Sequence, residues 1–354
     1  MTPSRYQRQI VLPGIGDQGQ ARLAAARVVI VGVGALGCAS AEMLTRAGVG
    51  LAAAGGWLSL LDRDVVELTN LQRQCLYTEA DARAGLPKVE AAAARLAAIN
   101  SEVAIRPLAA DLTSANALRL LGCDQATGAK PSLIIDGTDN FATRFLLNDI
   151  AVKFQIPFCY AGVVAGAGTQ ATFIPGQTGC LRCLLPTPPD PSSLATCDTA
   201  GVLAPAVQIV AGAQVADAIK ILTGNEARLS HSVLSFDLWT NRRTRIAIPR
   251  PDPACPCCGQ RVFDFLNAPA DDELARLCGQ NSVQVAGHSA LDLALLAQRL
   301  EPWGGVARSG VMLRFDPADL PTTRFTIFAD GRAIVRGTTD SARARSLYAR
   351  YIGA

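Results

Sequence analysis

The chain has 354 residues, of which 49% are hydrophobic and 18% charged, and its formal net charge is +3. This composition is that of a globular protein with room for one large domain and a smaller one. The weak net charge argues against nucleic acid or an anionic membrane as a partner. The N-terminus lacks the apolar core of a signal peptide, and polar side chains interrupt the longest apolar run, residues 202–221. We therefore expect a cytoplasmic protein without a membrane span.

Apolar segments alternate with helical patterns over the first part of the chain. This alternation predicts an α/β fold with a Rossmann-like, doubly wound mixed sheet. We expect an N-terminal helical arm over residues 5–26 and an enlarged loop over 50–57, which is rich in alanine and glycine. The predicted strands are 28–31, 58–61, 103–107, 133–136, 158–163, 169–174 and 233–237, the later ones antiparallel, and the predicted helices are 39–47, 88–99 and 202–222.

A composition shift at residues 267–270 predicts a linker and therefore two domains, 1–267 and 268–354. The second domain is expected to be a small α+β module that folds alone, and nothing in its residues indicates a role. Its Asp330-Gly331 pair predicts a tight hairpin. The predicted strands of this module are 283–285, 311–315, 325–328 and 333–336, and its predicted helices are 291–300 and 342–351.

A glycine turn follows the first predicted strand. Gly32, Gly34 and Gly37 form the pattern G-x-G-x-x-G, which lets the start of a helix approach phosphates. The next strand ends on Asp62, where a ribose hydroxyl would be held. These features fit a nicotinamide-dependent oxidoreductase and an ATP-dependent enzyme equally well. The polar block at residues 70–74 favours ATP, because cleavage of a triphosphate needs cations on its oxygens.

The chain has eleven cysteines, and four of them form two C-x-x-C pairs. Cys180 with Cys183 and Cys255 with Cys258 have the spacing of zinc knuckles, and two knuckles complete a closed, structural Zn²⁺ site. Cys257 lies inside the second knuckle and is the spare thiol in this interpretation. Scattered core cysteines or two local redox pairs are the alternatives.

These motifs together resemble the MoeB/ThiF branch of the ubiquitin-activating superfamily. The resemblance covers roughly residues 5–265 and leaves the terminal module outside. Besides the two knuckles, the matching segments are, in family order, 5–10 (RYQRQI), the glycine turn, 62–64 (DRD), 70–74 (NLQRQ), 85–88 (GLPK), 137–140 (GTDN) and 196–205 (TCDTAGVLAP).

The resemblance implies a nucleotidyltransferase that uses ATP and Mg²⁺. Its substrate would be the C-terminal glycine carboxylate of a small β-grasp, ubiquitin-like sulfur-carrier protein with a glycine-glycine end. Adenylation activates that carboxylate for thiocarboxylate formation in the biosynthesis of a metabolite such as molybdopterin or thiamine. The tail does not resemble a rhodanese domain, so the sulfur would come from a separate donor. The family also implies a homodimer.

The resemblance assigns a site residue by residue. Asp62 would accept from the ribose hydroxyls, with Asp64 as a second polar contact. Asn70, Arg73 and Lys88 would neutralise phosphate oxygens, and Asp139 would hold Mg²⁺. Arg8 would reach the nucleotide of the other subunit. Cys197 lies between a segment rich in proline and serine and a long helix, and would be a nucleophile in some relatives and dispensable in others.

Several alternatives remain open at this point. Arg73 and Lys88 would otherwise be solvated surface charges, and Asp139 would only cap a helix. Asp64 would be a turn residue and Cys197 an unreactive loop thiol. Competing functions are an NAD-dependent oxidoreductase, a non-catalytic scaffold, and the same chemistry on another ubiquitin-like modifier or a peptide.

Overall fold

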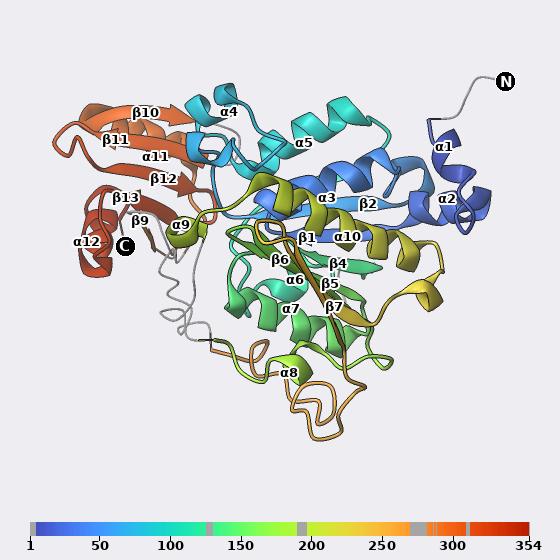
Figure 1. Ribbon diagram of the computed structural model, residues 1–354. Coiled ribbons are helices and arrows are strands. Elements are labelled where there is room, and N and C mark those ends of the chain that lie inside the picture. The colour runs from blue at the N-terminus through green and yellow to red at the C-terminus, as the bar shows by residue number, and fades with distance from the viewer. Residues whose placement is uncertain are drawn as a thin grey trace. The chain divides into compact units, whose positions relative to one another are not determined.

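The computed structural model describes residues 5–124, 130–189, 197–269, 282–285, 287, 289–308 and 312–353. The chain divides into two compact units, Met1–Ala270 and Asp271–Ala354 (Figure 1). Each unit has its own sheet and its own hydrophobic core.

An eight-stranded mixed sheet forms the first unit, in the order β3-β2-β1-β4-β5-β6-β7-β8. β1 to β5 pair in parallel, and β5 to β8 form an antiparallel meander. The order reverses between β1 and β4, which is where ligands bind in doubly wound sheets. The strands are β1 (Arg27–Val31), β2 (Trp57–Asp62), β3 (Ile105–Ala109), β4 (Leu133–Asp136), β5 (Phe158–Val164), β6 (Ala167–Phe173), β7 (Ser232–Asp237) and β8 (Arg242–Ala247).

Helices cover both faces of this sheet (Figure 1). α3, α5 and α10 lie on one face, and α7 lies on the other. The helices of the first unit are α1 (Gln7–Ile10), α2 (Gly16–Ala25), α3 (Ala35–Arg46), α4 (Glu79–Ala84), α5 (Lys88–Ile99), α6 (Ala117–Leu120), α7 (Phe141–Phe154), α8 (Leu181–Leu184), α9 (Cys197–Ala200) and α10 (Ala204–Leu222), with 3-10 turns η1 (Ala52–Ala54), η2 (Leu68–Asn70) and η4 (Glu226–Arg228).

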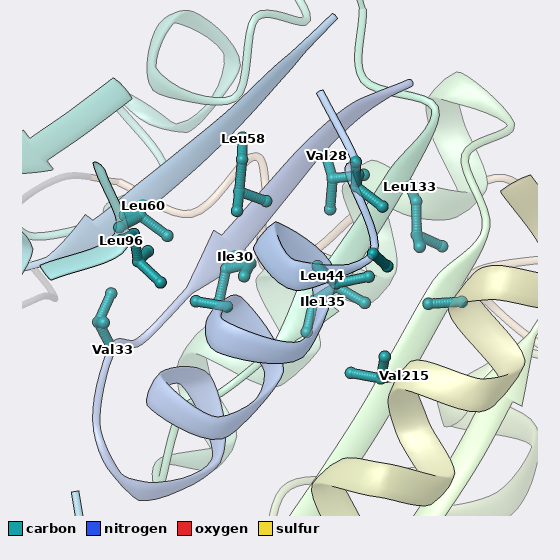
Figure 2. Packing of buried hydrophobic residues seen from close by; sticks show 14 of the residues in the cluster. Val28, Ile30, Val33, Leu44, Leu58, Leu60, Leu96, Leu133, Ile135 and Val215 are labelled. Carbon is teal, nitrogen blue, oxygen red and sulfur yellow. The ribbon is translucent and has the colours of Figure 1, made fainter. Parts of the chain in front are cut away.

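The central strand β1 shows why the sheet is apolar on both sides. Successive side chains of a strand point to opposite faces. Val28 and Ile30 therefore pack beneath α3 with Leu44, as Figure 2 shows, whereas Val29 and Val31 belong to the core on the α7 side. A strand covered on both faces reads as a continuous apolar run, which is the pattern at residues 28–31.

Helix α10 is long and apolar enough to cross a membrane by length and composition alone. In this structure 56% of its apolar window is buried inside the protein, and the helix packs on β5, β6 and α3. Its Gln214 side chain donates to the carbonyl oxygens of Asp136 and Cys159, both at 2.8 Å. These features are those of a core helix.

A five-stranded antiparallel sheet forms the second unit, in the order β10-β11-β12-β13-β9. Phe315, Phe325 and Tyr351 meet edge-to-face or tilted in its core. β12 and β13 are antiparallel around Asp330-Gly331, so the predicted hairpin is confirmed. The elements are β9 (Ser282–Val285), α11 (Leu293–Leu300), η6 (Glu301–Trp303), β10 (Gly304–Arg308), β11 (Met312–Pro317), β12 (Arg324–Phe328), β13 (Ala333–Arg336) and α12 (Ser341–Tyr351).

The predictions of local structure were incomplete in several places. The strand predicted at 103–107 begins at Ile105, because Val103 instead forms a bridge with Leu51. The predicted enlarged loop at 50–57 connects α3 to β2, and it contains the turn η1, which the sequence pattern did not indicate. It is held by that bridge and by the bond from Ala52 N to Glu102 O. The sequence pattern also missed α7, β8 and β10.

Candidate active site and metal centre

The glycine turn connects the end of β1 to the start of α3. Gly32 has φ +83° and lies so close to Gly137 that a Cβ there would be 2.7 Å from the Gly137 carbonyl carbon. A Cβ on Gly37 would collide with the Gly32 carbonyl. At Gly34 an added Cβ would meet only Gln74 Nε2, at 4.0 Å, so space remains above the helix start. The first N–H groups of α3 have no acceptor within the helix, and this geometry suits an anionic ligand.

Asp62 stands at the end of β2, beside this turn. Its Oδ2 accepts from Val33 N at 2.6 Å, and its Oδ1 accepts from Asp64 N at 2.8 Å. Burial raises the pKa of the Asp62 carboxyl, and the charge of Lys88 opposes that rise. Each carboxylate oxygen has a further lone pair, so the side chain keeps acceptor capacity for a ligand.

Lys88 begins α5 and is buried although it is a lysine. Its Nζ lies 2.9 Å from Asp64 Oδ2. Burial alone would lower the pKa of Lys88, but the charges of Asp64 and Asp62 raise it above its usual 10.5, with a smaller contribution from Asp139. Lys88 is therefore not a solvated surface charge, and Asp64 is more than a turn residue.

Asn70 and Arg73 lie in and after the turn η2. Asn70 is buried, and its Oδ1 accepts from Glu67 N at 3.1 Å, which closes the turn. Arg73 is half-buried, and one of its N–H groups donates to Thr69 O at 2.9 Å. A guanidinium has five N–H donors, so this bond holds the side chain in place and leaves most of its donor capacity for a ligand.

Asp139 follows β4 in an exposed position. The helix that begins after it, α7, is capped by Asn140, whose Oδ1 accepts from Thr143 N at 2.8 Å. Asp139 is thus not the helix cap. The other acid of this strand end, Asp136, is fully buried and pairs with Arg144 at 3.0 Å. Asp139 is therefore the acid at this strand end that faces solvent.

The structure does not bring Arg8 to these residues within one chain. Arg8 is exposed on α1. The neighbouring Gln9 Nε2 donates to Ala47 O at 3.0 Å, and the Tyr6 hydroxyl accepts from Asn100 Nδ2 at 2.8 Å. Ala47 and Asn100 follow α3 and α5, whose opposite ends carry the glycine turn and Lys88. A 12-residue helix is about 18 Å long, so Arg8 lies roughly that far from its own glycine turn.

Cys197 is the first residue of α9. The chain just after α9 pairs with the β5–β6 turn, through bonds of 2.8 Å from Ala165 N to Gly201 O and from Leu203 N to Ala165 O. The Cys197 side chain lies outside the described residues, so its predicted role stays a prediction.

The four cysteines of the two knuckles come together in the first unit. Their sulfur atoms all lie within 4.8 Å of one another. Cys180 Sγ is 3.7 Å from Cys255 Sγ, and Cys183 Sγ is 3.4 Å from Cys258 Sγ. Four sulfurs at about 2.3 Å from a tetrahedral Zn²⁺ would be about 3.8 Å apart. The cluster therefore fits the metal that the spacing predicts.

Cys257 is not among these four sulfurs. It is buried beside them, and its Sγ accepts a hydrogen bond from Asn148 Nδ2 at 3.3 Å. Sequence reasoning missed Asn148 and also missed Arg144, because α7 was not predicted. The GTDN segment pointed only to the residues before that helix.

The family model described as the ThiF family matches residues 6–257. The chain belongs to the ThiF family. One relative, the "Sulfur carrier protein ThiS adenylyltransferase" of Bacillus subtilis (strain 168), is 44% identical over 353 residues, which is 99% of each chain. The predicted resemblance is confirmed, except that this relative also matches the second unit, which we expected to lie outside.

A further relative and a solved structure are also similar to this chain. The "Adenylyltransferase and sulfurtransferase MOCS3" of Anopheles gambiae is 38% identical over 258 residues, covering 73% of this chain and 55% of that protein. The chain therefore spans about half of that relative's length. The crystal structure of E. coli MccB with MccA-N7isoASN has a TM-score of 0.61 at 24% identity, over 73% of this chain and 75% of the other. This last likeness shows the fold alone.

Proposed function

We propose that this protein adenylates the C-terminal glycine carboxylate of a small ubiquitin-like sulfur-carrier protein. The observation that carries the proposal is the 44% identity to a ThiS adenylyltransferase, which extends over 99% of both chains. The reaction consumes ATP, forms a carrier-acyl-AMP and releases pyrophosphate. A carboxylate is a poor electrophile because its leaving oxygen is too basic, and coupling to AMP gives it a good leaving group for attack by a sulfur donor.

The residues around the glycine turn divide the work of binding ATP. The N–H groups at the start of α3 receive phosphate oxygens above Gly34, and Asp62 accepts from the ribose hydroxyls. Lys88 and Arg73 stabilise the charge that builds on the phosphates when pyrophosphate leaves. Asn70 is buried at the end of the turn η2, just before Arg73, and contributes its side-chain amide to the binding of the phosphates.

Asp139 is the acid that would hold Mg²⁺ beside the phosphates, because Asp136 is already paired with Arg144. When bound, this ion neutralises phosphate charge and supports departure of pyrophosphate. Carboxylates are ligands that Mg²⁺ prefers, and the exposed position of Asp139 suits a site completed by water and phosphate oxygens.

The active protein is proposed to be a homodimer. Arg8 lies too far from its own glycine turn to touch a bound nucleotide, so it would act on the nucleotide of the second copy. The arm that carries Arg8 also exposes two large apolar side chains, Val11 at 64% and Leu12 at 57%. A second copy that covers this arm would bury them.

The cysteine cluster would hold a structural Zn²⁺. All four ligand positions are filled by Cys180, Cys183, Cys255 and Cys258, which leaves no open position for substrate. When bound, the ion joins two segments of the chain that lie 75 residues apart. The sulfur donor is proposed to be a separate protein. Cys197 is a candidate nucleophile in the step after adenylation.

Intact-mass measurement of the carrier tests this function. Carriers with a glycine-glycine end are incubated with the protein, ATP and Mg²⁺, and we expect one of them to gain the mass of an adenylate. The matched control is the same carrier without its last glycine, which is expected to stay unchanged. If no carrier is modified by dimeric, zinc-loaded protein, the substrate belongs to another class.

A further inference from the structure

Three polar residues follow one face of α7, beginning with the residue that caps the helix. Asn140, Arg144 and Asn148 are spaced at i, i+4 and i+8, which places them one above the other. Arg144 is 5% exposed and Asn148 is 1% exposed. Asn140 lies at the strand-end loop that carries Asp139, and Asn148 lies at the cysteine cluster.

At its N-terminal end, α7 holds the loop 137–140. Asn140 caps the helix, and Arg144 donates from Nε to Asp136 Oδ2 at 3.0 Å. One terminal nitrogen of Arg144 also donates to Thr138 O at 2.7 Å and to Ala161 O at 2.9 Å. The backbone immediately before Asp139 is therefore fixed by a side chain of α7.

At the other end of this face, one amide contacts both zinc knuckles. Asn148 Oδ1 accepts from Leu181 N, inside the first knuckle, at 2.8 Å. Its Nδ2 donates to Cys257 Sγ, inside the second knuckle, at 3.3 Å. The next residue, Asp149, accepts from Phe265 N at 2.9 Å through Oδ2, just beyond the second knuckle.

We propose that Asn148 is a positioning residue that couples zinc binding at the cysteine cluster to Mg²⁺-ATP binding at the loop 137–140. The nucleotide and the metal in this statement rest on the proposed function. Zinc fixes the two knuckles relative to each other, and Asn148 transmits that arrangement to α7. Asn148 and Asn140 are eight residues apart, about 12 Å along the helix. Because a helix is a rigid element, a displacement of α7 at Asn148 also displaces the loop 137–140.

A purely structural role would predict something different. Asn148 would then be a buried amide satisfied by two partners, and its loss would lower stability and zinc retention without changing the affinity of the folded protein for ATP. The nucleotide dissociation constant is therefore the measurement that separates the two accounts, and it requires no carrier protein and no turnover.

The test uses the full chain and three variants. Asn148→Ala removes both hydrogen bonds, and Asn148→Asp keeps the acceptor for Leu181 N while losing the donor to Cys257. Asn116→Ala is the control, since among the described residues the Asn116 side chain bonds only within its own turn, accepting from Thr113 N at 2.9 Å and donating to Asp111 O at 2.8 Å. Calorimetry with Mg²⁺-ATP, before and after removal of zinc by a chelator, gives the dissociation constant, and circular dichroism reports the fold.

We expect zinc removal to weaken Mg²⁺-ATP binding by the wild-type protein roughly 3- to 30-fold. Zinc-loaded Asn148→Ala is expected to show a similar weakening and faster zinc release, with less than about twofold further loss when zinc is removed, because coupled changes are not additive. Asn148→Asp should likewise weaken Mg²⁺-ATP binding and release zinc faster. Asn116→Ala should behave as the wild type does.

Two results would overturn the proposal. One is a folded Asn148 variant that releases zinc faster but binds Mg²⁺-ATP as the wild type does. The other is a wild-type protein whose affinity for Mg²⁺-ATP is unchanged without zinc, which decides the question even if neither Asn148 variant folds. Failure of the proposed function would look different, as normal Mg²⁺-ATP binding with no modification of any carrier.

Discussion

The ammonium group of Lys88 lies 2.9 Å from the carboxylate of Asp64, at the point where the start of α5 meets the end of β2. The lysine is buried, whereas Asp64 remains partly open to solvent, with a third of its side chain exposed. A buried cation held by one carboxylate at the edge of a glycine turn has a fixed position and a permanent charge. In the proposed function, this charge stabilises the phosphates of ATP when pyrophosphate leaves.

Replacing Lys88 by methionine is expected to lower the rate of adenylation roughly 10²- to 10³-fold, the usual loss when a charge that stabilises a transition state is removed. Lys88→Arg, which keeps the charge, should retain part of the activity. The measurement is the initial rate at saturating carrier, with Lys153→Met as the control. Because neighbouring charges raise its pKa, Lys88 should not titrate between pH 6 and 9, and a rate that follows such a titration would argue against its role.

Arg73→Ala is expected to lower the rate of adenylation about 100-fold. The fold should stay intact, because the side chain is half-exposed and, within the part of the chain that the structure describes, bonds only locally to Thr69 O. Arg83, which is exposed on α4 and pairs with Glu79, offers a matched control for loss of an arginine nearby. Thermal unfolding should be the same for both variants. Full activity of Arg73→Ala would remove it from the site.

Subunit mixing tests whether two chains share a site. Arg8→Ala homodimers and Asp139→Asn homodimers should each be nearly inactive. Each mixed dimer then contains one site with both residues intact, so random exchange should restore about a quarter of the wild-type rate. Two different affinity tags verify that mixed dimers have formed. If they form and no activity returns, Arg8 does not act on the partner's nucleotide.

Cys258→Ser is expected to lose bound zinc and to lower the unfolding midpoint of the first unit by roughly 10 °C, as for a metal that contributes about 3 kcal/mol. Cys257→Ser should still purify with one zinc, because Cys257 is not among the four clustered sulfurs. Metal analysis and a thermal melt of both proteins check this. Equal zinc contents in the two variants would contradict the four-cysteine site.

Much of the sheet was predictable because its strands are covered on both faces. Residues 28–31 and 133–135 are continuous apolar runs, which in an alternating α/β pattern favour strands buried on both faces. Helix α7 was missed for a related reason: residues 144–152 are all buried, so its apolar side chains form no stripe, and Arg144 and Asn148 interrupt them. β8 was missed because all six of its residues are exposed and three are arginines.

The candidate site was predictable as a set of motifs but not as an arrangement. Spacing alone identified the knuckles, since four thiols at C-x-x-C intervals have few other uses. It could not reveal that Asp136 is paired with Arg144, or that Asn140 and not Asp139 caps α7. It also could not place Arg8 near the C-terminal ends of α3 and α5, because that position depends on how the N-terminal arm packs against Ala47 and Asn100.

The most direct test of the central claim is ATP–pyrophosphate exchange in the presence of Mg²⁺ with each small carrier protein that ends in glycine-glycine. Exchange reports reversible formation of an acyl-adenylate and needs no sulfur donor. We predict rapid exchange that depends on one carrier and disappears when its terminal glycine is deleted. Exchange that is absent with every carrier, from dimeric protein that contains zinc and binds Mg²⁺-ATP, would contradict carrier adenylation.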